Sequence, residues 1–418
     1  MREKSISMRP FFILWSGQAI STLGSQVVQF ALIWWLTIET GSAAVLATAS
    51  LVGLLPQIVL GPFIGAAVDR WNRKLILFSA DSVTAVASLV LAYLFILGSV
   101  QVWQVYVILL VRAVGTGFHV PTMTSTTSLM VPEGHLTRVQ GINQMLSGGL
   151  MIIAAPLGAI ALELLPMQSI LGIDVVTALF AIVPLLFIAI PQPERSESEQ
   201  GGGEPEESMW ESMRFGFRYV RDWPGLAYLL AMSAIVGLAI YPAFSLLPLL
   251  ISDHFDAGAI QLGWLNIAFG IGVLIGGIAL SVWGGFKRRI LTALVGLLGL
   301  GVAILSLGLA PAGALTIAIV AMFAIGAMIP LTSGPLRATL QATVAKDVQG
   351  RVFTLLGSLE TVAIPVGLLV VGTLAEWLGV RTLYVLSGAT ILAVGTAAFF
   401  VPAIARFERG PEATMSEG

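Results

Sequence analysis

The sequence predicts an all-α membrane protein with twelve transmembrane helices in two pseudo-symmetric six-helix bundles. The first observation is the composition: of 418 residues, 57% are hydrophobic and 11% are charged, whereas an average soluble domain has about 25% charged residues. The second is a series of apolar runs, each close to the roughly 20 residues that a helix needs to cross a bilayer. The third is an internal repeat. Together they exclude a soluble globular enzyme, and the apolar excess excludes a disordered chain.

The apolar runs follow one another from the first residues to the last, separated by turn-forming residues such as Thr40-Gly41-Ser42 and Pro132-Glu133-Gly134. The first run follows Arg2, Lys4 and Arg9, as the apolar part of a signal peptide would, but it is too long and lacks a convincing cleavage site. We therefore expect it to be the first membrane helix. The twelve predicted spans are 11–38, 43–68, 75–98, 103–130, 139–165, 168–190, 225–251, 260–284, 290–309, 313–336, 353–377 and 382–404.

The basic residues predict the orientation of these spans. If the N-terminus is cytoplasmic, every Lys and Arg except Arg112 and Arg381 falls on a terminus or on a loop that follows an even-numbered span. Cytoplasmic loops of membrane proteins carry an excess of Lys and Arg. We therefore predict a multi-pass protein of the cell (inner) membrane with both termini in the cytoplasm.

One long hydrophilic segment divides the spans into two sets of six. Its first half is acidic and rich in Gly, as flexible linkers are. In its second half Trp210, Met213, Phe217 and Val220 share one helical face, which predicts an amphipathic helix on the membrane lipids; a solvated charged linker is the alternative. The predicted organisation is a bundle at 1–190, a cytoplasmic linker at 191–222, a bundle at 223–405 and a cytoplasmic tail at 406–418.

The two halves repeat one another at a constant offset of 209 residues (348 minus 139), which aligns Val139-Gln140-Gly141 with Val348-Gln349-Gly350. Parallel repeats of this kind are typical of secondary transporters, which bind substrate between the halves and expose it to each side in turn. Proline bends a helix by removing a hydrogen bond, so matched prolines predict shared bends. The pairs are Pro121 with Pro330 and Pro156 with Pro365.

The segment Gly65-Ala-Ala-Val-Asp69-Arg70-Trp-Asn-Arg73-Lys74 resembles the helix 2–3 loop signature of the major facilitator superfamily, Gly-x-x-x-Asp-Arg-x-Gly-Arg-Lys. Asn72 replaces the usual Gly, and we expect it to keep the turn because Asn tolerates a left-handed conformation. The resemblance implies the major facilitator fold. It also implies a cytoplasmic gate in which Asp69 meets the N-terminus of the helix that begins near Arg351; an ordinary surface salt bridge is the alternative. The gate residues are Gly65, Asp69, Arg70, Arg73 and Lys74.

Arg112-Ala-Val-Gly-Thr-Gly-Phe-His119-Val-Pro121 looks like helix 4 of the drug-exporting branch of that superfamily. It is similar more narrowly to the group of macrolide-efflux proteins and enterobactin exporters. Ala155-Pro156-Leu157-Gly158 is a degraded form of the helix 5 antiporter motif, Gly-Pro-x-x-Gly-Gly. The resemblance therefore implies an efflux transporter of the multidrug-resistance type.

Two polar helix faces are candidates for the substrate cavity. Gln18, Thr22, Ser25 and Gln29 recur at spacings of 4, 3 and 4, and Arg112 and His119 share a face of the fourth span. Polar groups inside a membrane face the protein interior or a water-filled cavity. The alternative is that these side chains form hydrogen bonds with neighbouring helices and contact no substrate.

Proton coupling needs a carboxylate inside the membrane that exchanges a proton as its access changes, and burial favours the neutral form of such a group. The candidates are Asp174, Asp81, Glu360 and Glu39. Arg112 keeps its proton under all conditions and lies at a depth similar to that of Asp174, which favours Asp174 slightly. Depth alone does not decide whether the two are adjacent.

These patterns favour a monomeric, proton-coupled exporter of amphipathic small molecules, which are either drug- or macrolide-like or siderophore-like. A facilitative or importing transporter, or a lipid flippase, would fit the same fold. The chain has no Cys and only three His, so we expect no metal, no other cofactor and no enzymatic activity. The basic residues are too dispersed for nucleic-acid binding. No Walker A motif is present, although a membrane subunit of an ATP-driven transporter is the alternative from another class.

Overall fold

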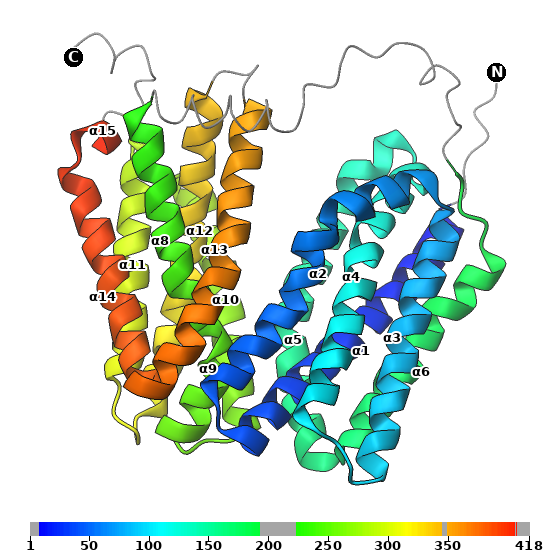
Figure 1. Cartoon of the computed structure of the whole chain (residues 1–418). Helices are drawn as coiled ribbons and strands as arrows, with labels where there is room; N and C mark the ends of the chain where they lie inside the picture. Colours follow the sequence, from blue (N-terminus) through cyan, green and yellow to red (C-terminus); the bar gives the residue numbers. More distant parts are fainter. Residues whose placement is uncertain (1–7, 193–222, 345–348, 406, 408–418) are drawn as a thin grey trace, which may run out of the picture. The chain divides into compact units, whose positions relative to one another are not determined.

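A computed structural model describes residues 8–192, 223–344, 349–405 and 407 (Figure 1). Every regular element in these ranges is helical, and twelve of the helices are long and apolar enough to cross a membrane. The predicted all-α fold with twelve spans is confirmed. The chain divides into two compact units, one built mainly from residues 1–41 and 48–196 and the other mainly from residues 197–257 and 264–418.

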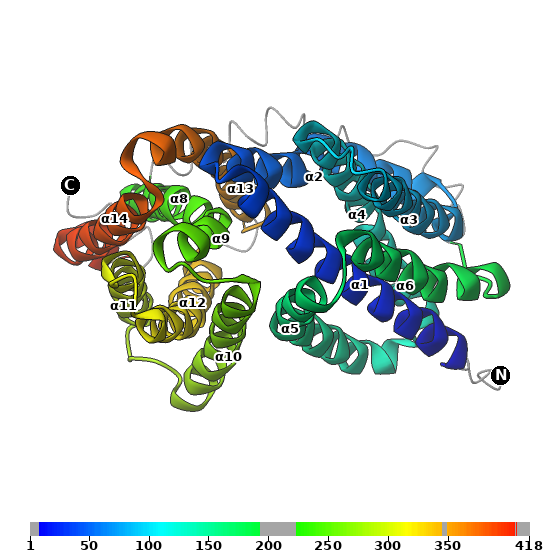
Figure 2. The same ribbon diagram turned by 90° about the horizontal axis from the view of Figure 1, so that it is seen from below.

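The first unit contains six long helices. Among them α6 lies between α1 and α3 and packs against both (Figure 2). Because α4 packs against α3, the four helices α1, α3, α4 and α6 enclose a common interior. The bounds are α1 Arg9–Thr40, α2 Ala43–Arg70, α3 Arg73–Ile96, α4 Val102–Met130, α5 Glu133–Leu164 and α6 Met167–Phe187.

The second unit also has six long helices. Its best-buried helix is α11, which packs against α12 and α14, while α8 packs against α13 and α14. The bounds are α8 Pro224–Ser245, α10 Ala259–Trp283, α11 Arg289–Leu309, α12 Leu315–Thr343, α13 Gln349–Leu378 and α14 Val380–Phe400. Short helices are α9 Leu247–Leu249, the π-helix η2 Leu250–His254 and α15 Pro402–Ala405.

The predicted span 225–251 is not one continuous helix. It ends as α8 at Ser245 and continues through α9 into the π-helix η2. The physical reason is Pro248, which has no N–H to donate to the carbonyl of Phe244 and so interrupts the ladder of hydrogen bonds. Hydropathy alone does not detect this break, since Leu246, Leu247, Leu249 and Leu250 are all apolar and buried.

Other helix ends differ from the predicted spans because hydropathy marks the apolar part of a helix, whereas the backbone ladder continues beyond it. The predicted span 313–336, for example, corresponds to α12, which begins at Leu315 and continues to Thr343. Each of the four matched prolines lies inside a helix, in α4, α5, α12 and α13. The predicted linker helix with Trp210 lies outside the described residues.

Candidate functional site

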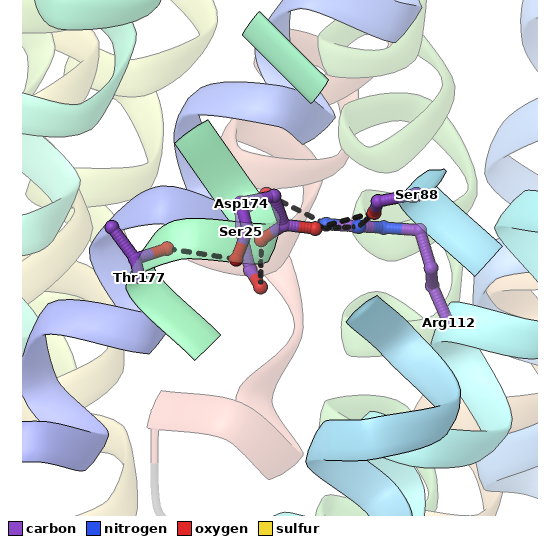
Figure 3. Close-up of polar contacts among 5 residues, drawn as sticks. All are labelled: Ser25, Ser88, Arg112, Asp174 and Thr177. Carbon is purple, nitrogen blue, oxygen red and sulfur yellow. Dashed lines mark hydrogen bonds and ion pairs between the residues drawn. The ribbon is translucent and has the colours of Figure 1, made fainter. Parts of the chain in front are cut away.

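A buried ion pair lies inside the first unit (Figure 3). Arg112 of α4 donates through Nη1 to Oδ2 of Asp174 on α6. The same carboxylate accepts hydrogen bonds from Ser25 Oγ of α1 at 2.8 Å and from Ser88 Oγ of α3 at 2.5 Å. Arg112 Nη2 also donates to the carbonyl of Ser25. We call Ser25, Ser88, Arg112 and Asp174 the Asp174 layer; it joins four helices, and Asp174 is only 1% exposed.

Two glycines on α1 allow this layer to form. A Cβ atom at Gly17 would lie closer than 3.0 Å to the carbonyl oxygen of Phe180, and one at Gly24 would lie equally close to Thr177. The backbones of α1 and α6 therefore approach more closely than larger residues permit. Thr177 Oγ1 in turn donates to the backbone carbonyl of Asp174 at 3.0 Å (Figure 3). This close contact brings Ser25 within hydrogen-bond distance of Asp174.

A second polar cluster, the Asp81 layer, consists of Gln18, Asp81 and His119. Gln18 Nε2 donates to Asp81 Oδ2 at 2.9 Å, and Gln18 Oε1 lies 2.7 Å from His119 Nε2. His119 Nε2 is also 3.7 Å from Asp81 Oδ1. Gln18 and Asp81 are buried. The amide of Gln18 thus bridges a carboxylate and an imidazole.

The two layers are in register along three helices. Seven residues separate Gln18 from Ser25 on α1, Asp81 from Ser88 on α3, and Arg112 from His119 on α4. Seven residues are two helical turns, or about 10 Å. Ser88 was not among the predicted site residues, yet this shared spacing was present in the sequence and could have identified it.

A small cavity of about 110 Å³ lies between the layers. Its wall includes the hydroxyl-bearing residues Ser21, Thr22, Thr84 and Thr116, which stand on the turns between the two layers. Ser25, Asp81 and His119 also line it. Asp81 and His119 of one layer and the hydroxyl of Ser25 from the other therefore face the same partly open space.

A larger, apolar cavity of about 460 Å³ lies between α3 and α4. Trp71, Phe78 and Phe118 contribute to its wall, and the rings of Trp71 and Phe118 are stacked with centroids 6.4 Å apart. Asn72 and Ser79 add the few polar groups. Such a wall suits the apolar part of an amphipathic molecule.

The predicted gate segment forms the turn between α2 and α3. Asn72 does not take the left-handed conformation expected from its match to Gly: its φ is −68°, and its Oδ1 accepts hydrogen bonds from the backbone N–H groups of Lys74 and Leu75. Asn therefore replaces Gly here as the N-cap of α3. Arg73 is buried and donates through Nε to Ser125 Oγ at 2.6 Å.

The remaining gate residues differ in their surroundings. Lys74 Nζ donates to the carbonyl of Leu186 in the last turn of α6, where a cation meets the negative end of the helix dipole. Gly65 and Arg70 are exposed. Asp69 belongs to α2, but its side chain lies outside the described part of the structure, so its gate contact with the N-terminus of the helix that begins near Arg351 stays a prediction.

The polar side chains of α1 mostly form hydrogen bonds within the bundle. Gln18 and Ser25 bond to neighbouring helices, which is the alternative interpretation given above, and Thr22 Oγ1 donates to the carbonyl of Gln18. Gln29 is half-buried and Glu39 is exposed at the end of α1. Glu360 belongs to α13, with a side chain outside the described part. Substrate contacts by these residues stay a prediction.

Among the described residues, no three His, Asp or Glu side chains lie together in a position to hold a metal ion.

Comparison with known proteins gives one family match. The family model described as Major Facilitator Superfamily matches residues 14–367 and residues 229–416. Macrolide efflux protein A of Streptococcus pyogenes is 33% identical over 385 residues, which cover 92% of this chain and 94% of that protein. The multidrug efflux pump Tap of Mycolicibacterium fortuitum is 25% identical over 410 residues, covering 94% of this chain and 96% of the pump.

Solved structures with the same fold are more distant in sequence. A bacterial homologue of the iron transporter ferroportin, in an inward-facing state, has a TM-score of 0.70 at 14% identity, over 96% of this chain and 99% of that one. A bacterial homologue of the human lysosomal transporter Spinster has a TM-score of 0.65 at 16% identity, over 96% of both chains. At these identities the likeness concerns the fold alone.

Proposed function

This chain belongs to the major facilitator superfamily, and we propose that it is a secondary transporter that exports macrolide-like, amphipathic small molecules in exchange for protons. Its family and fold point to a transporter of small molecules rather than to an enzyme. Export and the substrate class are supported by the macrolide and multidrug efflux proteins among its relatives. Alternating access of the two halves is the mechanism that we propose.

The observation that carries the coupling proposal is the pair of charged layers inside an apolar bundle. Ionisable residues within membrane helices are costly and are typically kept for ion or proton movement. Asp81 and Asp174 are both buried, and both lie in hydrogen-bond networks that reach Arg112 or His119. They are therefore stronger coupling candidates than Glu39, which is exposed at the end of α1.

We also propose that the protein is a monomer in the cell (inner) membrane, surrounded by its lipids, with both termini in the cytoplasm. The distribution of Lys and Arg supports this orientation. In that orientation, inverted membrane vesicles accumulate an exported substrate inside.

The first prediction concerns transport itself. Inverted vesicles that contain the protein should accumulate a radiolabelled macrolide when their interior is acidified, because protons leaving the vesicle drive substrate entry. Collapse of the gradient by a protonophore should abolish the accumulation. Equal concentrations of labelled and unlabelled macrolide should still exchange across the membrane without a gradient.

The matched control is the set of vesicles from cells without the protein. Accumulation that needs ATP and ignores the pH gradient would contradict secondary transport. Equilibration without accumulation would indicate a facilitator, and accumulation only in right-side-out vesicles would indicate an importer.

The second prediction concerns the gate. Asp69→Asn should reduce macrolide turnover in liposomes and leave macrolide binding in detergent intact. A carboxylate at a helix N-terminus contributes about 0.3–1 kcal/mol, so we expect the balance between gate states to shift up to about fivefold. Glu163→Gln, at an exposed position near the end of α5, is the control. Equal turnover in both variants would make Asp69 an ordinary surface charge.

A further inference from the structure

The charges of the two layers do not balance. Among the described residues of α1, α3, α4 and α6, four titratable acids and bases lie in these layers: Asp81, Arg112, His119 and Asp174. The charged residues of α2 and α5 lie at the ends of those helices. With a neutral His119, one guanidinium faces two carboxylates and the interior has one excess negative charge. An unbalanced buried charge is strongly unfavourable, whereas one added proton makes the cluster neutral.

The Asp174 layer is the less favourable place for the added proton. Asp174 Oδ1 accepts from Ser25, and Oδ2 accepts from Ser88 and from the guanidinium of Arg112, which keeps its own proton. Three of the about four lone-pair sites of this carboxylate are thus filled, and its charge is already balanced by Arg112.

The Asp81 layer, in contrast, has room for the proton at two atoms. Asp81 Oδ2 accepts from Gln18, while Oδ1 lies 3.7 Å from the His119 ring, beyond hydrogen-bond distance. Gln18 Oε1 is an acceptor, so His119 Nε2 carries hydrogen and Nδ1 is the ring atom open to protonation. One proton, on either Asp81 Oδ1 or His119 Nδ1, neutralises the cluster.

The cavity between the layers connects these atoms to their surroundings. A volume of about 110 Å³ is well above the roughly 10–15 Å³ that one water molecule needs, so the cavity has room for several. The hydroxyl groups of Ser21, Thr84 and Thr116 can each donate and accept, as a chain of hydrogen-bonded water requires. Thr22 and Ser25 donate within the bundle and offer acceptor sites only. Asp81 and His119 both face this space.

We propose that Asp81 and His119, bridged by Gln18, share a single exchangeable proton, and that the hydroxyl-lined cavity is the chamber through which water delivers and removes it. A hydronium ion in the chamber gives its proton to Asp81 or His119 and becomes water, and the reverse step releases the proton. Arg112 and Asp174 stay charged and act as positioning residues. The role in transport rests on the proposed proton-coupled export, but the proton site is a property of the folded chain.

Infrared difference spectra between two pH values test the site without any substrate. The full chain in liposomes should show one proton that titrates as carboxylic acid or imidazolium within the cluster. Asp81→Asn should remove this signal, because Arg112 and Asp174 then balance each other. His135, His254 and the other acids contribute equally to each variant and cancel in the comparison.

The double variant Asp174→Asn with Arg112→Gln, which removes both charges of the ion pair, shows whether the signal comes from Asp81 or from Asp174. Asp174→Asn alone should also remove the signal, since Arg112 then balances Asp81. Adding Arg112→Gln should restore it, because Asp81 again has an excess charge. A signal that survives Asp81→Asn would overturn the proposal, as would its absence from a double variant that elutes as a folded monodisperse species.

If the double variant does not fold, the single variant His119→Gln provides an independent test of the proton site. Only Asp81 can then hold the proton, so the titrating signal should be wholly carboxylic acid; its absence would overturn the proposal. A titrating signal in the wild type without transport driven by a pH gradient would refute proton-coupled export and support the proton site. Transport driven by a pH gradient without the signal would support proton-coupled export and refute the proton site.

Discussion

Replacement of Arg112 by Met is expected to destabilise the protein by about 3–5 kcal/mol, the usual cost of removing one partner from a buried ion pair. Asp174, at 1% exposure, would keep its hydrogen bonds from Ser25 and Ser88 and lose its counter-ion. Unfolding of the purified protein in detergent, followed by heat or denaturant, measures the loss. Acidification should lessen it, because an added proton removes the unpaired charge.

Two further variants show whether the lost pairing is the cause. Arg138→Met, at an exposed position of α5, removes the same charge and should change stability little. Arg112→Met with Asp174→Leu removes both charges and should recover most of the stability, since apolar replacement of a whole buried pair is often neutral. A double variant as unstable as Arg112→Met would assign the loss to packing around the arginine stem.

Most of the fold of this membrane protein could be predicted from its sequence. Apolar runs and the positions of turn residues were enough for all twelve spans, because the bilayer requires each helix to satisfy its own backbone. What hydropathy could not predict was the interruption after Ser245, which depends on the missing N–H of Pro248 and not on polarity. The extension of α12 to Thr343 was missed for a related reason, since helices continue beyond the apolar layer.

The candidate site was only partly predictable. Depth along the helices placed Arg112 and Asp174 at the same level, but which faces of α4 and α6 meet depends on tertiary packing, and the structure shows their contact. Gln18 bridges Asp81 and His119, contacts that hydropathy does not reveal, and its expected place in the substrate cavity stays a prediction. A period of seven on three helices would have predicted the members of both layers on α1, α3 and α4, because residues two turns apart return to nearly the same face. It gives no sign of Asp174, which lies on α6.

Packing in the second unit depends on an equally local feature, the glycines between α10 and α12. Cβ atoms at Gly272, Gly276 and Gly326 would each lie closer than 3.0 Å to a backbone carbonyl of the facing helix. Backbone atoms cannot rotate away as a side chain can, so even one methyl group forces the helices apart. We therefore expect Gly276→Ala to cost about 1–3 kcal/mol or more, seen as a lower unfolding temperature in detergent and a smaller monodisperse fraction.

The adjacent residue provides the control. A Cβ atom at Gly277 would meet nothing within 4 Å, so Gly277→Ala adds the same methyl group to the same helix without a clash. Because Ala is a better helix former than Gly by roughly 0.5–1 kcal/mol, this variant should be as stable as the parent or slightly more so. Equal losses in the two variants would contradict the packing argument and point to a need for flexibility in α10. A loss confined to Gly276→Ala would show that the close approach of α10 and α12 holds this unit together.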